Sequence, residues 1–402
     1  MKTRRAFLSG AAAGAALVAG VIPTRADVSP GVTDKVIKIG QTMPYSGPAS
    51  AYGVIGRTEA AYFKWLNEQG GVNGRMINLI SLDDGYSPPK TVEQTRRLVE
   101  QEQVAFLFNP LGTGPCLATR EYLNQNRIPQ LFVATGAAAF SDPEHYKWTV
   151  GFQPNYQTES RIFGKHILAT KPDAKVAVLY QNDGFGKDYL IGLKDGLGPD
   201  RVGMVIKEAS YETSEPTVDS QIATLQGSGA DVFLIAATPK FAAQAIRKSY
   251  DLGWSATRYV TDVSLSIATV MKAAGFEKAR GLITANYGKD ASDPRWKDDV
   301  GFQQYKDFIE KYMTAKDLVD SNAIYGYDAA ICLVDVLKRC GNDLSRENIL
   351  EQATGIKELE LPMLLPGIKI NTSSSNYSPI RQMQLQSFNS VSWELFGELL
   401  QG

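Results

Sequence analysis

Short apolar runs alternate with amphipathic stretches from Asp34 onward. Near-continuous apolar runs with β-branched or aromatic members are typical of buried strands, and apolar residues three and four positions apart are typical of helices. The first part of the pattern predicts strands over 36–41, 76–82, 104–108 and 130–134, with helices over 58–68, 90–102 and 115–125. The next part predicts strands over 176–180, 202–206, 231–236, 259–261 and 281–286, with helices over 187–196, 218–226, 241–250 and 267–274.

Single helices between successive strands predict parallel sheets with right-handed crossovers. The two series meet near residues 148–156, so we expect an α/β protein with two doubly wound lobes. One eight-stranded barrel is the alternative fold, although its strands would be spaced more evenly along the chain.

The last third of the chain has a different pattern. Its amphipathic stretches predict helices over 296–313 and 322–339, and antiparallel strands are expected over 364–370, 381–388 and 392–396, with a Ser- and Asn-rich loop over 371–379. We expect the helices to return to the first lobe and the final hairpin to cover the second. The predicted lobes are therefore residues 34–152 plus 286–370 and residues 153–285 plus 371–402. Several crossings between them make a hinge with a restricted direction of motion.

The first 26 residues have the features of an export signal. Arg4 and Arg5 give a positive start, residues 11–22 form a mildly apolar run, and Ala26 is a small residue at the expected cleavage position. The two adjacent arginines followed by Phe7 resemble a twin-arginine signal, and an ordinary secretory signal is the alternative. Either signal would export the protein, so we expect a periplasmic location.

Composition narrows the possible partners. The 402 residues carry 42 Lys and Arg against 43 Asp and Glu, a net charge of −1, which argues against nucleic-acid binding because phosphates require a basic face. The three cysteines, Cys116, Cys332 and Cys340, are an odd count. The last two are eight residues apart in one predicted helix, about 12 Å along its axis, too far to form a disulfide. Three packed free cysteines are expected.

The motifs of the sequence favour a binding protein over an enzyme. The sequence contains no Walker A, HExxH or GxSxG motif, and residues 184–186 (GFG) only begin like a dinucleotide fingerprint. Asp83 and Asp84 end a strand and could hold a metal, although such a pair before Gly85 is more often a turn that caps the next helix. His145 is expected in a surface loop and His166 in a helix. We predict no catalytic residue, metal or cofactor.

The loops after the predicted strands are better candidates for a binding site. In open α/β sheets, ligands lie beyond the carboxyl ends of the strands. Small residues there let backbone amides approach a ligand, and helix N-termini present N–H groups that suit a carboxylate. The loops combine hydroxyls and aromatic rings: Ser46, Tyr52, Thr113, Thr135, Phe185 and Thr238.

Several of these segments resemble one family, the leucine/isoleucine/valine-type periplasmic substrate-binding proteins of ABC transporters. The opening IKIGQTMPYSGP at 37–48 and NEQGGVNG at 67–74 are the most specific blocks. Further matches cover most of the chain after the export signal: Tyr52-Gly53, Asp83-Asp84, Pro89-Lys90, IPQLFVATG at 128–136, and the segments 178–186 and 253–262. The resemblance implies a type I periplasmic binding fold whose two lobes close around a small solute.

The resemblance also implies ligand-binding positions, carried over one residue at a time: Tyr52, Thr113, Ala134, Thr135, Gly136, Phe185, Thr238 and Asp262. Two of them depart from the family, because Gly136 lacks the expected hydroxyl and Thr238 stands where a tyrosine is expected. Asp262 falls at or beside the acid that would pair with a ligand ammonium, with the register uncertain by one residue. The family's disulfide positions fall near Tyr86 and Gly112, so that bridge is absent.

These positions lead to a hypothesis about the solute and its destination. A small organic carboxylate is expected, with branched-chain amino acids and aromatic acids as the leading classes, since a buried ammonium would need Asp262 as its partner. A monomer would deliver the solute to an ABC permease in the inner membrane. The alternatives are an exported ligand-sensing module and an exported α/β enzyme, and the latter is disfavoured by the lack of a nucleophile and base.

Overall fold

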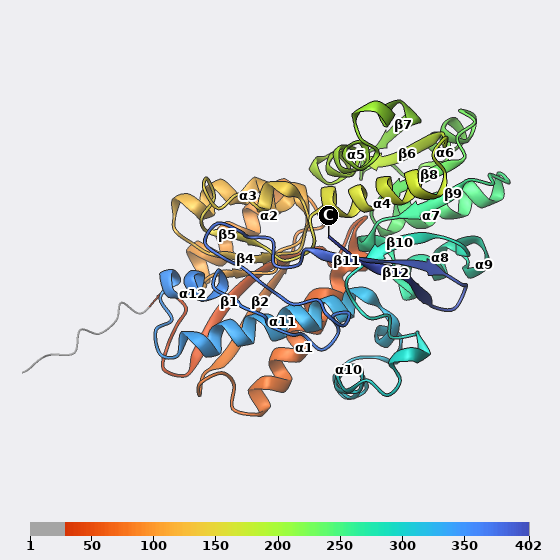
Figure 1. The fold of residues 1–402 in the computed structure, drawn as a ribbon. Helices are drawn as coiled ribbons and strands as arrows, with labels where there is room; N and C mark the ends of the chain where they lie inside the picture. Colours follow the sequence, from red (N-terminus) through yellow and green to blue (C-terminus); the bar gives the residue numbers. More distant parts are fainter. Residues whose placement is uncertain (1–28, 402) are drawn as a thin grey trace, which may run out of the picture.

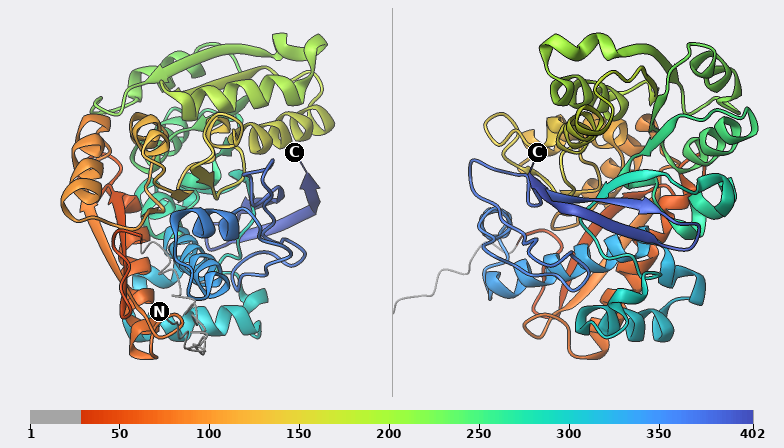
Figure 2. Two further views of the ribbon diagram at one scale, coloured as in Figure 1. Left: turned by 90° about the vertical axis from the view of Figure 1, so that its left-hand side faces the viewer. Right: turned by 45° about the vertical axis from the view of Figure 1, so that its right-hand side comes forward.

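A computed structural model describes residues 29–401 of the chain. They form two α/β lobes, each built on its own sheet, as Figures 1 and 2 show. The expectation of two doubly wound lobes is confirmed. The export signal predicted for residues 1–26 lies outside the described residues.

The first lobe contains a parallel five-stranded sheet in the order β2-β1-β3-β4-β5. Its strands are β1 (Val36–Met43), β2 (Met76–Asp83), β3 (Leu107–Phe108), β4 (Gln130–Val133) and β5 (Thr149–Gly151). Strand β1 pairs with β2 in register, with Ile39 opposite Leu79. The buried apolar residues Ile37, Ile39 and Met43 lie on one face of β1, and Gly40 and Thr42 are buried on the other.

Helices cover both faces of this sheet. They are α1 (Gly53–Glu68), α2 (Pro88–Arg96), α3 (Thr113–Gln125), α10 (Val300–Tyr312), α11 (Ser321–Cys340) and α12 (Arg346–Ala353). Helix α1 packs against α11, whereas α2 packs against α3 on the other side of the sheet (Figure 1). Because α10 to α12 come from the last third of the chain, this lobe is closed by residues far from its strands in sequence.

The second lobe contains a seven-stranded sheet in the order β12-β11-β10-β9-β8-β6-β7. Its strands are β6 (Val176–Gln181), β7 (Val205–Tyr211), β8 (Val232–Ala236), β9 (Thr257–Val260), β10 (Ile283–Asn286), β11 (Gln382–Phe388) and β12 (Trp393–Gln401). Strands β6 to β10 are parallel, and the hairpin β11–β12 adds two antiparallel strands. The C-terminal hairpin therefore extends the edge of this sheet, as Figure 2 shows.

Alternate residues of the central strands feed two cores in the second lobe. Phe233 and Ile235 of β8 face one core, and Leu234 faces the other. Helices α6 (Asp219–Gln226) and α7 (Pro239–Asp251) pack on the first face, and α4 (Tyr156–Thr170) and α5 (Gly184–Leu197) on the second. The short helices α8 (Lys272–Ala274) and α9 (Phe276–Ala279) lie beside α7.

The chain crosses between the sheets after β5, after β10, and again between Ile370 and β11. These crossings support the lobe boundaries given above, which stay a prediction. They bring the segment after β10 and the start of α11 next to the space between the lobes, where both segments contribute residues to the cavity described below.

Several predicted elements are wrong or incomplete. Residues 364–370 form only isolated bridges instead of a strand, because Pro366 lacks an N–H and Gly367 adopts φ 90°. Residues Pro199–Met204 form a 3-10 turn that begins at a proline, so the strand predicted over 202–206 is instead β7, from Val205. Helices α4 and α12 and the short strand β5 were not predicted.

The three cysteines are free and buried as the sequence indicates, and the acidic pair forms the expected turn without capping the next helix. Cys116, Cys332 and Cys340 are free and buried. Asp83 binds the backbone N–H groups of Tyr45 and Ser46 and the ammonium of Lys90, so it belongs to a turn. The side chain of Asp84 accepts from Tyr86 N and Thr91 Oγ1 and caps no helical N–H at the start of α2.

Candidate ligand-binding site

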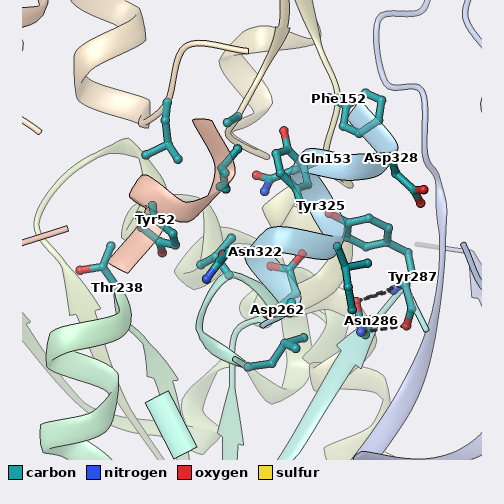
Figure 3. Close-up of a pocket in the computed structure, with 18 of the residues that line it drawn as sticks. Tyr52, Phe152, Gln153, Thr238, Asp262, Asn286, Tyr287, Asn322, Tyr325 and Asp328 are labelled. Carbon is teal, nitrogen blue, oxygen red and sulfur yellow. Dashed lines mark hydrogen bonds between the residues drawn. The ribbon is translucent and has the colours of Figure 1, made fainter. Parts of the chain in front are cut away.

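One cavity lies between the two lobes, at the carboxyl ends of their strands (Figure 3). Its interior volume is about 80 Å³, room for several water molecules and therefore for a small solute. Residues from the first lobe, the second lobe and the segment after β10 all line it. In Figure 3, Tyr52 and Thr238 lie toward one end of the cavity, and Phe152 and Asp328 toward the other.

Six of the eight predicted ligand-binding residues line this cavity: Tyr52, Thr113, Ala134, Phe185, Thr238 and Asp262. They come from both lobes, although their sequence positions span more than 200 residues. Thr135 and Gly136 are buried next to the cavity but do not line it. Thr135 instead holds Thr113 in place, with 2.7 Å between the two hydroxyl oxygens. Whether these residues bind the ligand stays a prediction.

The first-lobe wall offers hydrogen-bond donors. Thr113 is the first residue of α3, and its side chain is almost fully buried. Within residues 29–401, the backbone N–H of Thr113 donates to no other group, nor does that of the next residue, Gly114, which does not itself line the cavity. Unpaired N–H groups at a helix N-terminus carry partial positive charge, so this wall favours a carboxylate.

The two departures from the family have physical causes in this fold. A Cβ on Gly136 would lie 2.2 Å from the carbonyl oxygen of Pro154 and 2.8 Å from the ring of Tyr156, so no side chain fits there. At Thr238, the hydroxyl of Tyr211 accepts the backbone N–H at 2.9 Å and lies 3.2 Å from the threonine hydroxyl. A tyrosine hydroxyl is therefore present beside position 238, although it comes from β7.

The positions that correspond to the family's disulfide lie together as well. A Cβ on Gly112 would be 2.6 Å from Cε2 of Tyr86, and Gly112 adopts φ 106°. The aromatic ring of Tyr86 thus occupies the space beside Gly112, and packing takes the place of a covalent link.

The second-lobe wall carries carboxyl groups. Asp262 follows β9 and is 8% exposed, and Glu159 of α4 lies behind it at 1% exposure. Glu159 Oε1 accepts the backbone N–H of Asp262 at 2.8 Å, and the hydroxyl of Tyr189 donates to Glu159 Oε2. Burial raises the pKa of Asp262 and that of Glu159, because the ionised forms lose hydration there.

The sequence did not indicate several residues of the site. Glu159 lies behind Asp262 without lining the cavity. The other residues line its surface: Gln153, Tyr156, Asn286, Tyr287, Asn322, Tyr325 and Asp328. Asn286 and Tyr287 end β10, so the rule about carboxyl ends of strands could have found them. Asn322, Tyr325 and Asp328 lie on α11, which the pattern assigns only to core packing. No local signal marks them as cavity residues.

Asp328 is a second carboxyl group in the cavity, without another carboxyl beside it. Burial raises its pKa to about 8, so it is protonated at neutral pH. Its Oδ1 accepts the backbone N–H of Met363 at 3.3 Å. The nearby ammonium of Lys289 is already bonded to Asp299 at 2.6 Å and to the carbonyl of Pro362 at 2.8 Å.

Hydrogen bonds cross between the lobes around the cavity. Asp188 of α5 accepts the backbone N–H of Ala138 at 2.8 Å, and Ser266 donates to Asp320 at 3.0 Å. Asp320 also accepts the N–H of Asn322 and so caps α11. These contacts show a closed arrangement, with both walls facing the same small volume.

Two features are absent from the described part of the chain, a metal-binding cluster and a membrane-spanning helix. Across residues 29–401, no group of three or more His, Cys, Asp or Glu side chains is arranged to hold a metal ion. No helix in this same part of the chain combines the length and the apolar character that crossing a bilayer requires.

Comparisons with known proteins agree with this geometry. The family model described as "Periplasmic binding protein" matches residues 36–391. A Leu/Ile/Val-binding protein homolog 2 from Brucella abortus is 24% identical over 330 residues, which cover 80% of this chain and 82% of the relative.

Two solved structures share the fold. A branched chain amino acid ABC transporter from Thermus thermophilus with bound valine has a TM-score of 0.83 and 17% identity, over 92% of this chain and 98% of that one. A fatty acid ABC transporter substrate-binding protein from Thermomonospora curvata has a TM-score of 0.78 and 20% identity, over 94% and 96%. Because the family consists of binding proteins, the chain is a binding protein and not an enzyme. It belongs to the periplasmic binding protein family, among relatives of the Leu/Ile/Val-binding type.

Proposed function

We propose that this protein is the exported solute-binding subunit of an ABC importer and that its solute is an amino acid with a small apolar side chain. The observation that carries the proposal is the difference between the two walls of the cavity. The first lobe presents free N–H groups at the start of α3, and the second presents the carboxyl group of Asp262. A zwitterion has one charge for each wall.

The apolar part of the cavity suits the rest of such a ligand. Tyr52, Phe152 and Phe185 line it together with Leu111 and Ile324. Burying an aliphatic side chain against these groups is worth about 1.5–3 kcal/mol. The charged ends then fix the orientation of the ligand, while the apolar side chain adds affinity.

The charges of the two walls favour this class over the competing ones. An aromatic or fatty acid carries only a carboxylate, so it would make no ion pair with Asp262 and would lack that contribution to its affinity. Of the residues that line the cavity in the described part of the chain, Lys289 alone is basic, and its ammonium is already bonded to Asp299. An amino acid is therefore favoured over an aromatic acid, which is the other candidate class.

Closure is the expected mechanism of capture. The ligand first meets one wall in the open form and gains the contacts of the other wall as the lobes close, so its affinity difference shifts the population toward the closed form. We expect the bonds Ser266–Asp320 and Asp188–Ala138, which join the two lobes, to form as the cleft closes. We infer that the closed form is the one that docks on a permease. A sensing module would use the same closure with a different partner.

Calorimetry on refolded, ligand-stripped protein tests the proposal. We expect L-leucine, L-isoleucine or L-valine to bind at micromolar or lower concentration, and benzoate to bind more weakly. X-ray scattering should then show a smaller radius of gyration with the bound amino acid. Failure to bind any of these amino acids would overturn the proposed solute class, and an unchanged radius would contradict closure.

A further inference from the structure

Glu159 is a buried acid that the proposed site does not yet use. It lies in the first turn of α4 and is 1% exposed. Its carboxyl group lies behind Asp262, although the two residues are 103 positions apart in the sequence. A fully buried carboxyl group at this place loses its hydration and needs compensation from its neighbours.

The neighbours of Glu159 bind it closely. Oε1 accepts the backbone N–H of Asp262 at 2.8 Å, and Oε2 accepts the hydroxyl of Tyr189. The hydroxyl of Tyr189 also lies 3.4 Å from Oδ1 of Asp262, so the same hydroxyl contacts both acids. Two ionised carboxylates held this close in a buried site would repel each other, so the arrangement favours a proton on one of them.

Among residues 29–401, no basic group faces the pair from the elements packed around it. Helix α4 contributes Tyr156, α5 contributes Tyr189, and the segment after β10 contributes Tyr287, all with raised pKa values because of burial. His166, also on α4, is seven residues away, about 10 Å along the helix, and bonds to Tyr259. The charged residues of the neighbouring cavity wall are engaged elsewhere: Lys289 with Asp299, Asp290 with Trp393 N, and Asp320 with Ser266.

Two buried carboxyl groups this close together, with no basic group beside them among residues 29–401, therefore favour a shared proton. Both pKa values are raised by burial, and the pair titrates as a unit. A cation that enters beside Asp262 makes the same electrostatic contribution as the proton. The two compete for the same place, because keeping both would leave an excess positive charge in a buried site.

We propose that Glu159 is the second carboxyl group of the ligand-ammonium site, and that capture of an amino-bearing solute expels the proton that Glu159 and Asp262 share. The proton leaves to solvent as the ammonium takes its position, and no covalent bond to carbon changes. This inference rests on the proposed function, since it needs a solute with an ammonium group. It adds Glu159, which does not line the cavity, to the binding site. It also adds a proton to the binding equilibrium.

Calorimetry with L-leucine in two buffers of different ionisation enthalpy measures the released proton. At pH 6 to 7 we expect a clear fraction of one proton to be released per leucine bound. The affinity should rise as pH rises from 5 to 8, by up to tenfold per pH unit, because deprotonation of the pair is then less costly. Release of no proton together with a flat pH profile would overturn the inference while leaving the proposed function intact.

Two variants identify the source of the proton. Glu159→Gln keeps the shape and removes the shared proton, so proton release and the pH slope should both disappear. Asp328→Asn removes an acid of the same cavity that has no carboxyl partner, and proton release should persist. If Asp328→Asn abolishes the release and Glu159→Gln does not, the pair is not its source and the inference is wrong. If Glu159→Gln does not fold, the wild-type pH profile and Asp328→Asn still decide. If none of leucine, isoleucine and valine binds the wild-type protein, the proposed function fails and the inference fails with it.

Discussion

The two walls of the cavity are built by similar sheets but have opposite chemistry. On the first lobe, β3 and β4 end in small residues and hydroxyls, and the start of α3 leaves the N–H groups of Thr113 and Gly114 free. On the second lobe, Asp262 follows the end of β9 at Val260, with Glu159 of α4 behind it. The same strand-end position thus holds donors on one side and acids on the other.

This difference explains how a protein with two lobes can recognise both charged ends of one solute. Neither wall alone distinguishes an amino acid from a simple acid or a simple amine. Closure brings the walls together, and the bond between Ser266 and Asp320 joins them at one edge of the cavity. Specificity is therefore a property of the closed form, because only there do both walls contact the solute.

The largest expected effect comes from removing the acid of the second wall. Asp262→Asn should weaken L-leucine binding by about 2–5 kcal/mol, at least thirtyfold, because a buried ammonium loses its charged partner. Benzoate, which has no ammonium, should bind the variant about as well as the wild type. Calorimetry with both ligands makes the measurement. An equal affinity for leucine in both proteins would place Asp262 outside the site.

A smaller effect is expected where the chain crosses from the first lobe to the second. Gly136→Ala would place a methyl group against the carbonyl oxygen of Pro154, which is backbone and cannot move by rotating a side chain. The free energy of unfolding should fall by about 1–3 kcal/mol, as measured by urea denaturation. Gly203→Ala is the matched control, because nothing lies within 4 Å of its added carbon. An equally stable Gly136→Ala variant would show that the crossing has room for the family's hydroxyl.

The smallest expected effect concerns the hydroxyl of the first wall. Thr113→Val keeps the shape of the side chain but removes its hydrogen bond to Thr135. The affinity for L-leucine should fall by about 1 kcal/mol, roughly fivefold, since the backbone N–H groups remain. Thr113→Ser, which keeps the hydroxyl, should bind like the wild type. A loss as large as that of Asp262→Asn would mean that the first wall depends on the side chain and not on the backbone.

Much of the fold could be predicted from local pattern. The strands β6 and β8 could be predicted because buried parallel strands carry apolar residues on both faces, and β1 because its apolar residues Ile37, Ile39 and Met43 share one buried face. Residues 364–370 have the same apolar composition, yet Pro366 and Gly367 prevent a ladder there. Helix α4 has a clear start at Asn155, whose side chain accepts the N–H of Gln157, but it lies where the two lobes join.

The sequence by itself determined the alternation of strands and helices, the two-lobe architecture and the loops in which most of the cavity residues occur, because these depend on spacing along the chain. Only the tertiary structure decided which groups meet. It placed Glu159 behind Asp262 and the start of α11 beside the segment after β10. It also filled the space at Gly136 with Tyr156. Such pairings depend on distances between helices and strands that are far apart in sequence, and the charge of a buried acid depends on what those distances bring next to it.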